Sequence, residues 1–208
     1  MSETAARKPW TLPVRNRHLL LTRGRRRAMP PVKTLRALGL KRGMCFLDVG
    51  CGPGYFAIPA CGVVGKHGRV LACDVSPMMI TELRAGAKER GYANMTAKRN
   101  RGYRIPFPDA CADFVLIAFV LHGVAEIQRL LAESRRAMKN GAAITLIDWH
   151  KKPMDMGPPL EARLEPEELV SELRQAGFRK ARWWDFDGNT YFASALAPGG
   201  CQGRGDAL

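Results

Sequence analysis

An apolar run that ends in an acid and is followed by glycine at every second position constrains the fold of this chain most. The run 44–49 has the length and apolar content of a buried strand, and the segment 55–64, beyond the glycines of 50–54, has the character of a helix. A tight glycine turn between a strand and a helix brings bare backbone and the positive end of a helix dipole beside a ligand. The stretch therefore predicts a site for a small, partly anionic ligand.

Strands and helices alternate along the rest of the chain. Further strands are expected at 69–73, 95–98, 112–119 and 143–147, helices at 31–40, 76–90, 125–139 and 166–176, and a closing hairpin at 181–186 and 191–196. Such alternation is typical of a doubly wound α/β fold whose helices cover both faces of the sheet. We therefore expect a mostly parallel, seven-stranded sheet with a C-terminal antiparallel hairpin.

Length and charge divide the chain into three parts. With 208 residues, of which 46% are hydrophobic, the chain suits one compact domain, expected at 31–197, with a flexible glycine-rich tail at 198–208. The net charge is +14, and residues 1–30 carry eight Lys and Arg side chains against Glu3 alone. We expect this basic arm to be disordered when free and consider three roles: binding RNA or another acidic surface, organelle targeting, or none beyond a solvated tail.

The cysteines indicate a reducing compartment. The six residues are Cys45, Cys51, Cys61, Cys73, Cys111 and Cys201; they form no CxxC pair, and most lie within apolar runs. Loop-borne, closely spaced cysteines are typical of metal and disulfide frameworks, so we expect reduced thiols and no metal site. The sequence also has no apolar run near the ~20 residues of a membrane helix and no secretory signal at its start. A cytoplasmic location is the simplest prediction.

Acids and aromatic residues follow several of the predicted strands. In a parallel doubly wound sheet, ligands bind beyond the carboxyl ends of the strands, where Asp48, Asp74 and the segments 119–122 and 148–150 should converge. A dinucleotide fingerprint would place its third glycine at position 55, which is Tyr55 here. The spacing therefore disfavours NAD, whereas Asp74 suits hydrogen bonding to ribose hydroxyls.

The sequences Asp48-Val49-Gly50-Cys51-Gly52-Pro53-Gly54 and Val70-Leu71-Ala72-Cys73-Asp74-Val75-Ser76 together resemble the class I S-adenosylmethionine-dependent methyltransferases. The resemblance continues through 105–109, 113–124 and 137–142 and covers about residues 31–197. It is strongest to the small ubiquinone/menaquinone-biosynthesis-like, type 11 group. Membership implies direct in-line transfer of a methyl group from S-adenosyl-L-methionine to an acceptor, expected to be an unidentified small molecule.

The resemblance also implies a set of cofactor-binding residues. Gly50, Gly52 and Gly54 would face the methionine part, with Asp48 and Cys51 in the same loop; Asp74 would hold the ribose, Val75 and Met78 would flank the adenine, and Phe119 and Val120 would lie beside the cofactor. Where family members often carry an acid near the adenine amino group, this chain has Asn100 and Arg101. Asn100 is expected to act as an amide partner, and Arg101 makes the rim of the site basic.

In-line transfer depends mainly on holding the acceptor in position, and a base is needed only for acceptors that must lose a proton. The candidates for that base are His122, Asp148 and His150. The alternative to a catalytic role for His122 is a structural one, in which its ring hydrogen-bonds to the backbone at the start of a helix.

Three other functions remain open. The basic arm would suit an RNA methyltransferase, although 118–122 lacks the Asn/Asp-Pro-Pro-Tyr/Phe segment of many base amino-methylating enzymes. A non-catalytic cofactor-binding or RNA-binding protein of the same fold is the second. An arsenite-type methyltransferase using Cys45, Cys51 and Cys73 is the third, but these thiols are not expected on one accessible rim.

Overall fold

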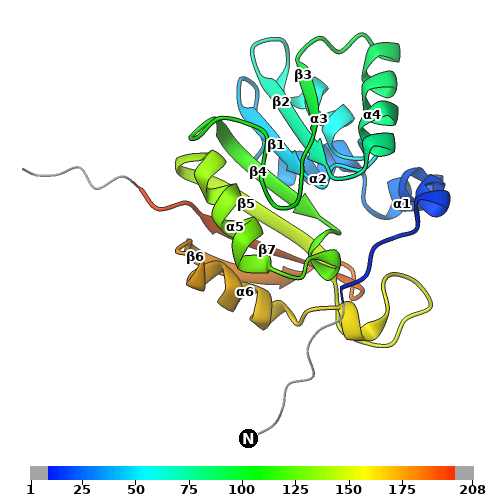
Figure 1. Cartoon of the computed structure of the whole chain (residues 1–208), viewed down its shortest axis with the longest axis vertical. Coiled ribbons are helices and arrows are strands. Elements are labelled where there is room, and N and C mark those ends of the chain that lie inside the picture. The colour runs from blue at the N-terminus through cyan, green and yellow to red at the C-terminus, as the bar shows by residue number, and fades with distance from the viewer. Residues whose placement is uncertain (1–8, 200–208) are drawn as a thin grey trace, which may run out of the picture.

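The computed structural model describes residues 9–199, which form one twisted seven-stranded sheet with helices on both faces (Figure 1). The strands are β1 (Cys45–Val49), β2 (Arg69–Asp74), β3 (Met95–Arg99), β4 (Ala112–Ala118), β5 (Met138–Trp149), β6 (Arg179–Asp185) and β7 (Thr190–Leu196). The helices are η1 (Val14–Leu21), α1 (Arg23–Ala28), α2 (Pro31–Ala37), α3 (Ala57–Val64), α4 (Pro77–Glu89), η2 (Leu121–Gly123), α5 (Ile127–Ala137), η3 (Leu160–Ala162) and α6 (Pro166–Gln175).

The strand order is β3-β2-β1-β4-β5-β7-β6. The first five strands in this order pair in parallel, whereas β7 is antiparallel to both β5 and β6. The order reverses between β1 and β4, and ligands bind at such a switch point in doubly wound sheets. The predicted fold class, including the C-terminal antiparallel hairpin, is confirmed.

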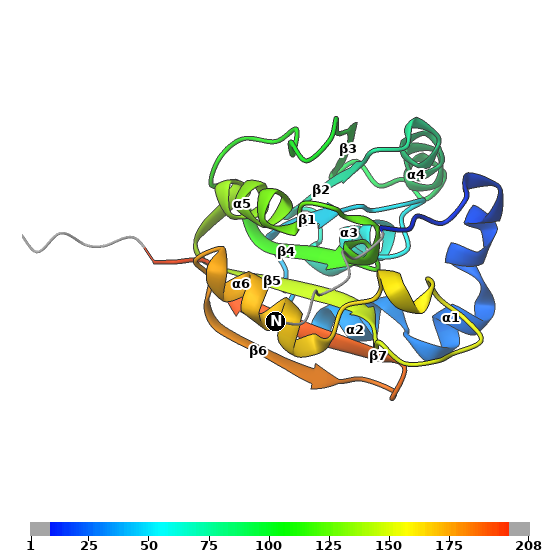
Figure 2. The same cartoon turned by 60° about the horizontal axis from the view of Figure 1, so that its bottom comes forward.

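Helices cover the two faces of the sheet (Figure 2), and an apolar cluster lies on each face. Successive side chains of a strand point to opposite faces, so Phe46 packs with α2, α3 and α4 while Leu47 packs with α5 and α6. The ends of the helices follow local rules: the Ser76 hydroxyl accepts from the N–H of Met79 with Pro77 at the first position of α4, and Glu165 and Glu168 form a capping box at α6.

The expectation of a disordered N-terminal arm is wrong for residues 9–30, which fold as η1 and α1 against the domain; residues 1–8 lie outside the described part. The Trp10 N–H donates to the His122 carbonyl at 3.0 Å, and Arg17 forms an ion pair with Glu82 of α4. The Tyr55 hydroxyl lies 2.9 and 2.6 Å from the carbonyl oxygens of Arg25 and Met29. Amino-acid composition predicts how the arm behaves without partners, whereas these long-range contacts hold the arm against the domain.

Strand β5 begins earlier than predicted. The sequence indicated a helix to residue 139 and a strand from 143, but α5 ends at Ala137 and pairing with β4 begins at Met138. The Asn140-Gly141 pair forms an irregularity within this strand, with Gly141 at φ +71° and the register with β4 shifted between Ala112 and Phe114.

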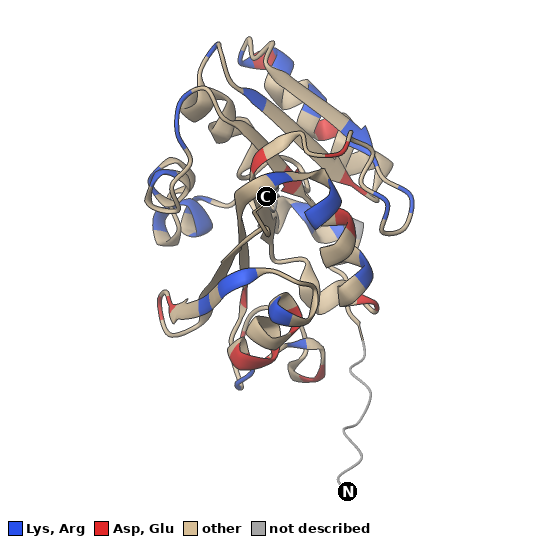
Figure 3. Ribbon diagram, turned by 90° about the vertical axis from the view of Figure 1, so that its left-hand side faces the viewer, with Lys and Arg blue, Asp and Glu red and all other residues tan. Residues whose placement is uncertain are grey.

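The described cysteines are free: Cys45, Cys51, Cys61 and Cys73 are buried, Cys111 is partly buried, and Cys201 lies outside the described residues. The expected glycine-rich tail falls almost entirely there as well, since only residues 198 and 199 of it are described. Among residues 9–199, no helix is long and apolar enough to cross a membrane. In the view of Figure 3, Lys and Arg residues lie on several helices, strands and loops of the described part of the chain.

Candidate active site

The glycine turn after β1 is fixed by backbone hydrogen bonds to the neighbouring strand. The N–H groups of Gly50 and Cys51 both donate to the Cys73 carbonyl, at 2.8 and 3.0 Å. Gly50 has φ +73°, and a Cβ atom there would lie 2.4 Å from Cγ2 of Val120. Glycine is required here for both reasons, and the close approach brings the loop after β4 against the turn after β1.

Asp74 joins the glycine turn to the start of α4. Its Oδ2 accepts from the Gly52 N–H at 2.9 Å and its Oδ1 from the Ser76 N–H at 2.8 Å. Burial raises the pKa of Asp74, and these two backbone donors oppose the rise. The carboxylate is thereby held in one orientation at the carboxyl end of β2.

The rim next to Asp74 carries the residues predicted to surround an adenine. Val75 and Met78 are exposed hydrophobic side chains, at 57% and 45%, and together they offer an apolar surface at this rim. Asn100 is buried, and its Nδ2 donates to the Gly102 carbonyl at 2.7 Å. Arg101 is exposed and bridges to Arg104 through its backbone.

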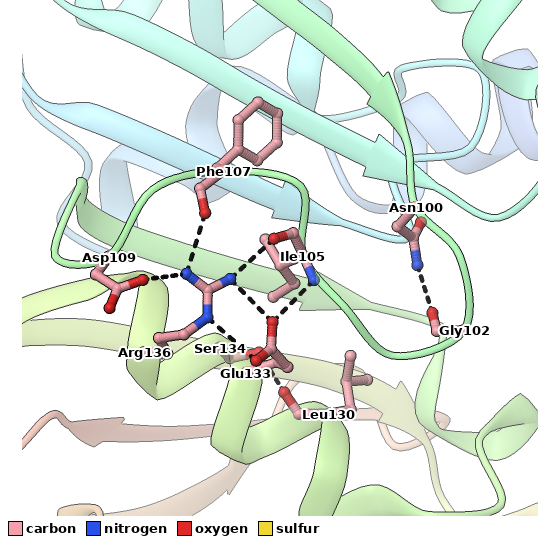
Figure 4. Close-up of polar contacts among 9 residues, drawn as sticks. All are labelled: Asn100, Gly102, Ile105, Phe107, Asp109, Leu130, Glu133, Ser134 and Arg136. Carbon is pink, nitrogen blue, oxygen red and sulfur yellow. Dashed lines mark hydrogen bonds and ion pairs between the residues drawn. The ribbon is translucent and has the colours of Figure 1, made fainter.

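Arg136 of α5 braces the loop that follows Gly102 (Figure 4). Its guanidinium donates to the carbonyls of Ile105 and Phe107 and pairs with Glu133 and Asp109. Glu133 in turn accepts from the Ile105 N–H at 3.1 Å. The loop is thus fixed to α5 from both its N–H and its carbonyl groups.

Asp48 is a buried acid at the end of β1. Its side chain is buried, with 2% of the residue exposed, and Oδ2 has no hydrogen-bond partner among the described residues. Burial raises the pKa of Asp48 to about 7, the charge of Asp74 adds to the rise, and the Ala57 N–H and Arg25 oppose it. A buried oxygen without a partner is costly in a folded protein, and its presence is a reason to look for a ligand.

His122 and Asp148 form a buried pair at the ends of β4 and β5. His122 Nδ1 lies 2.8 Å from Asp148 Oδ1, and the His122 N–H donates to Oδ2 at 3.2 Å. Asp148 Oδ1 also accepts from the Trp149 N–H at 2.9 Å. A carboxylate that accepts from Nδ1–H leaves Nε2 of the neutral ring with a free lone pair, the arrangement of a general base.

His150 belongs to a different environment, although it was predicted beside the other two. Its Nε2 lies 2.8 Å from Asp185 Oδ1 at the end of β6, and its ring neighbours those of Tyr191 and Trp183. The structure therefore joins His122 to Asp148 and joins His150 to the C-terminal hairpin.

Residues 24–157 match the model of the ubiE/COQ5 methyltransferase family. The chain belongs to this family. A demethylmenaquinone methyltransferase from Bacillus velezensis is 30% identical over 122 residues, which are 59% of this chain and 52% of the relative. The chain thus spans about half the length of the curated relatives it matches.

Solved structures agree with this assignment. A SAM-dependent methyltransferase from Aquifex aeolicus is 30% identical with a TM-score of 0.85, covering 90% of this chain and 100% of that one. An arsenic(III) S-adenosylmethionine methyltransferase from Chlamydomonas reinhardtii is 20% identical with a TM-score of 0.60, covering 76% and 64%, and shares the fold alone. The predicted class I S-adenosylmethionine-dependent methyltransferase family is therefore confirmed.

The thiols of this ubiE/COQ5 family member are poorly placed for an arsenite-type reaction. Cys45, Cys51 and Cys73 are buried. Burial raises the pKa of Cys51 well above its usual value, with the charges of Asp48 and Asp74 adding to the rise, and it raises the pKa of Cys73 to about 12. These sulfurs stay protonated, whereas metalloid binding needs thiolates.

Two residues next to the predicted Phe119 were missed by sequence analysis, the basic Arg25 and the aromatic Tyr55. The guanidinium of Arg25 in α1 lies 4.1 Å from the ring centroid of Tyr55 and 4.9 Å from that of Phe119. Phe119 has φ +60° and a ring 5.3 Å from that of Trp149. The signal available was Tyr55 itself, an aromatic residue placed directly after the glycine turn; nothing local in the sequence ties Arg25 to it.

Trp10 connects this site to a cavity of about 440 Å³ under the loop 152–160. Its ring centroid lies 6.0 Å from that of His122. Met154, Met156 and Leu160 contribute apolar walls. Arg163 organises the loop by donating to four carbonyls, those of His150, Lys152, Met156 and Pro158.

Proposed function

We propose that this chain transfers the methyl group of S-adenosyl-L-methionine to a small aromatic acceptor that carries an ionisable hydroxyl, in chemical class a reduced quinone. The observation that carries the proposal is the His122–Asp148 pair, which lies at the carboxyl ends of β4 and β5, on the same edge of the sheet as the glycine turn, in a member of the ubiE/COQ5 family. The relatives' printed name, demethylmenaquinone methyltransferase, supports the quinone class.

The residues at the glycine turn fit the cofactor. Asp74 offers its remaining lone pairs to ribose hydroxyls, and the exposed Val75 and Met78 offer an apolar surface to adenine. The orphaned Oδ2 of Asp48 suits the ammonium group of the amino-acid part. When bound, S-adenosyl-L-methionine supplies an electrophilic methyl group. The proposed contact set is completed by Gly50, Cys51, Gly52, Gly54, Phe119 and Val120. Its least supported members are Arg101 and Asn100, because the Asn100 amide already donates to Gly102.

His122 would act as the general base. Asp148 fixes the ring and favours the tautomer that leaves Nε2 able to accept a proton from an acceptor hydroxyl. Loss of that proton places negative charge on the aromatic ring and makes its carbon or oxygen atoms nucleophilic. Asp148 then stabilises the imidazolium that forms, as a positioning residue that does not itself take the proton. We assign no proton transfer to His150, because its partner Asp185 and its ring neighbours Trp183 and Tyr191 belong to the C-terminal hairpin.

The acceptor would enter beside Trp10. The cavity bordered by residues 152–160 is lined by methionine, leucine and proline side chains together with Lys152, Asp155 and Arg163. Its apolar part suits a flat ring, and its charged residues can meet polar groups at the edge of that ring. An RNA acceptor has less support, because Arg17 and Arg25 of the basic arm are engaged within the domain. A cytoplasmic location stays a prediction.

Calorimetry with S-adenosylhomocysteine and a methyl-transfer assay with radiolabelled S-adenosyl-L-methionine test the proposal. The wild type should bind the demethylated cofactor in the micromolar range, and Asp74→Ala should weaken binding by about 1–3 kcal/mol. Reduced naphthoquinones and RNA oligonucleotides are offered as acceptors, with label expected only on the former.

His122→Asn should lower methyl transfer about 10²-fold to 10⁴-fold while leaving the affinity for S-adenosylhomocysteine unchanged. His67→Asn, on an exposed loop, is the matched control and should change neither quantity. A wild type that fails to bind S-adenosylhomocysteine would refute the proposed activity. Label on RNA alone would refute the acceptor class.

A further inference from the structure

The basic arm delivers one arginine into the active site. Arg25 is the third residue of α1, and its guanidinium lies over Tyr55 and close to Phe119. Tyr55 follows the glycine turn and Phe119 follows β4, so the positive charge stands at the switch point. Arg26, on the same helix, is exposed and lies farther from Tyr55, at 5.7 Å.

The guanidinium is held but not neutralised. Within residues 9–199 it makes one hydrogen bond, from Nη1 to the Leu20 carbonyl at 2.9 Å, and no ion pair. An arginine presents five N–H donors in a planar fork that matches the two oxygens of a carboxylate. Burial lowers the pKa of Arg25 to about 10, with Tyr55 and Asp48 opposing the fall, so the group is charged at neutral pH.

A buried acid with one unpartnered oxygen faces the same site. Asp48 and Arg25 are close enough for their charges to interact, but they form no ion pair, and Asp48 Oδ2 has no hydrogen-bond partner among the described residues. Two opposite charges that share a site without pairing complement a molecule carrying both an ammonium and a carboxylate group.

We propose that Arg25 binds the α-carboxylate of the amino-acid part of S-adenosyl-L-methionine, opposite Asp48, which takes the ammonium group. This inference rests on the proposed function, because it concerns the same cofactor. It gives the arm a role in cofactor binding in place of RNA binding. Tyr55 positions the arginine, because its hydroxyl hydrogen-bonds to the carbonyls of Arg25 and Met29, at the two ends of the last turn of α1.

Ligands that differ in one group isolate the carboxylate contact. Calorimetric dissociation constants are measured for S-adenosylhomocysteine, for its decarboxylated analogue, and for 5′-methylthioadenosine, which lacks the whole amino-acid part. The proteins are the wild type, Arg25→Gln, Arg25→Lys and the control Arg27→Gln, an exposed position on the same helix.

The wild type and Arg27→Gln should prefer S-adenosylhomocysteine over the decarboxylated analogue by about tenfold to a hundredfold, as expected for a charge-assisted hydrogen-bonded pair. Arg25→Gln should lose that preference and bind 5′-methylthioadenosine as the wild type does, which also shows that the variant is folded. Arg25→Lys should keep part of the preference, because it retains the charge without the fork.

An unchanged preference in Arg25→Gln, or tighter binding of S-adenosylhomocysteine by that variant, would overturn the role of Arg25 while leaving the proposed function intact. Equal losses for all three ligands would do the same, since they would show a general effect on the site. A wild type that binds none of the three ligands would remove the proposed function and this inference together.

Discussion

Asp48 gives the sharpest prediction about the cofactor-free protein, because a buried acid without full hydrogen bonding makes stability depend on pH. Its pKa is raised in the folded state, from 3.8 to about 7. The folded protein therefore holds this proton more tightly than the unfolded chain does. Well below pH 3.8 the residue is neutral in both states. As the pH rises toward 7, the unfolded chain ionises first and the folded state loses stability relative to it.

The structure sets the size of this effect. At about 1.4 kcal/mol per pKa unit, the rise corresponds to a total of about 4 kcal/mol above pH 7, and about 2.5 kcal/mol of it develops between pH 5 and pH 7. Asn has the shape of the protonated acid and keeps an oxygen for the Ala57 N–H, but it cannot ionise. Asp48→Asn should therefore be more stable than the wild type, and increasingly so as the pH rises.

Urea unfolding at pH 5, 6, 7 and 8 measures the difference directly. The gain in unfolding free energy of Asp48→Asn over the wild type should increase by a few kcal/mol across this range. Asp155→Asn, at an exposed loop position, controls for loss of a negative charge and should show a small difference without this trend. A difference between Asp48→Asn and the wild type that does not change with pH would refute the reasoning.

Three further predictions concern the supports of the site. Gly50→Ala should lower the free energy of unfolding in urea by about 1–3 kcal/mol more than Gly188→Ala does. Both glycines have φ near +73°, but only at position 50 would the new Cβ lie 2.4 Å from Cγ2 of Val120. Equal losses of stability would exclude the clash. Tyr55→Phe should speed trypsin cleavage within α1 several-fold, since the contact to the Arg25 and Met29 carbonyls is lost; unchanged cleavage would mean that other contacts hold the arm. Glu133→Gln should accelerate amide exchange at Ile105, whose N–H it accepts, while protection elsewhere in the sheet stays as in the wild type.

Much of the fold followed from the sequence because its signals are local. The apolar runs placed all seven strands, Ser76-Pro77 marked the start of α4, and the glycine turn identified the switch point. The early start of β5 was missed because Asn140-Gly141, a usual sign of a turn between elements, lies within the strand as an irregularity.

The site was predicted less completely because its contacts join distant parts of the chain. The ends of β4 and β5 were expected to meet. The hydrogen bond between His122 and Asp148, however, depends on side-chain rotamers, and the pairing of His150 with Asp185 depends on the position of the C-terminal hairpin. No sequence motif encodes either of these. The roles predicted for individual residues stay predictions until cofactor binding is measured.

The two acids of the site show why the arm must be ordered for the site to be complete. Asp74 is partly buried and accepts hydrogen bonds from two backbone N–H groups, whereas Asp48 is fully buried and keeps one oxygen without a partner among the described residues. Arg25, whose charge lowers the pKa of Asp48, stands on α1 and is held there by Tyr55. The positive charge that made the arm appear to be a free nucleic-acid-binding tail thus includes a residue whose charge acts on a buried acid of the site. Amino-acid composition alone cannot distinguish nucleic-acid binding from a role in the active site, because it does not show which charged side chains lie close together.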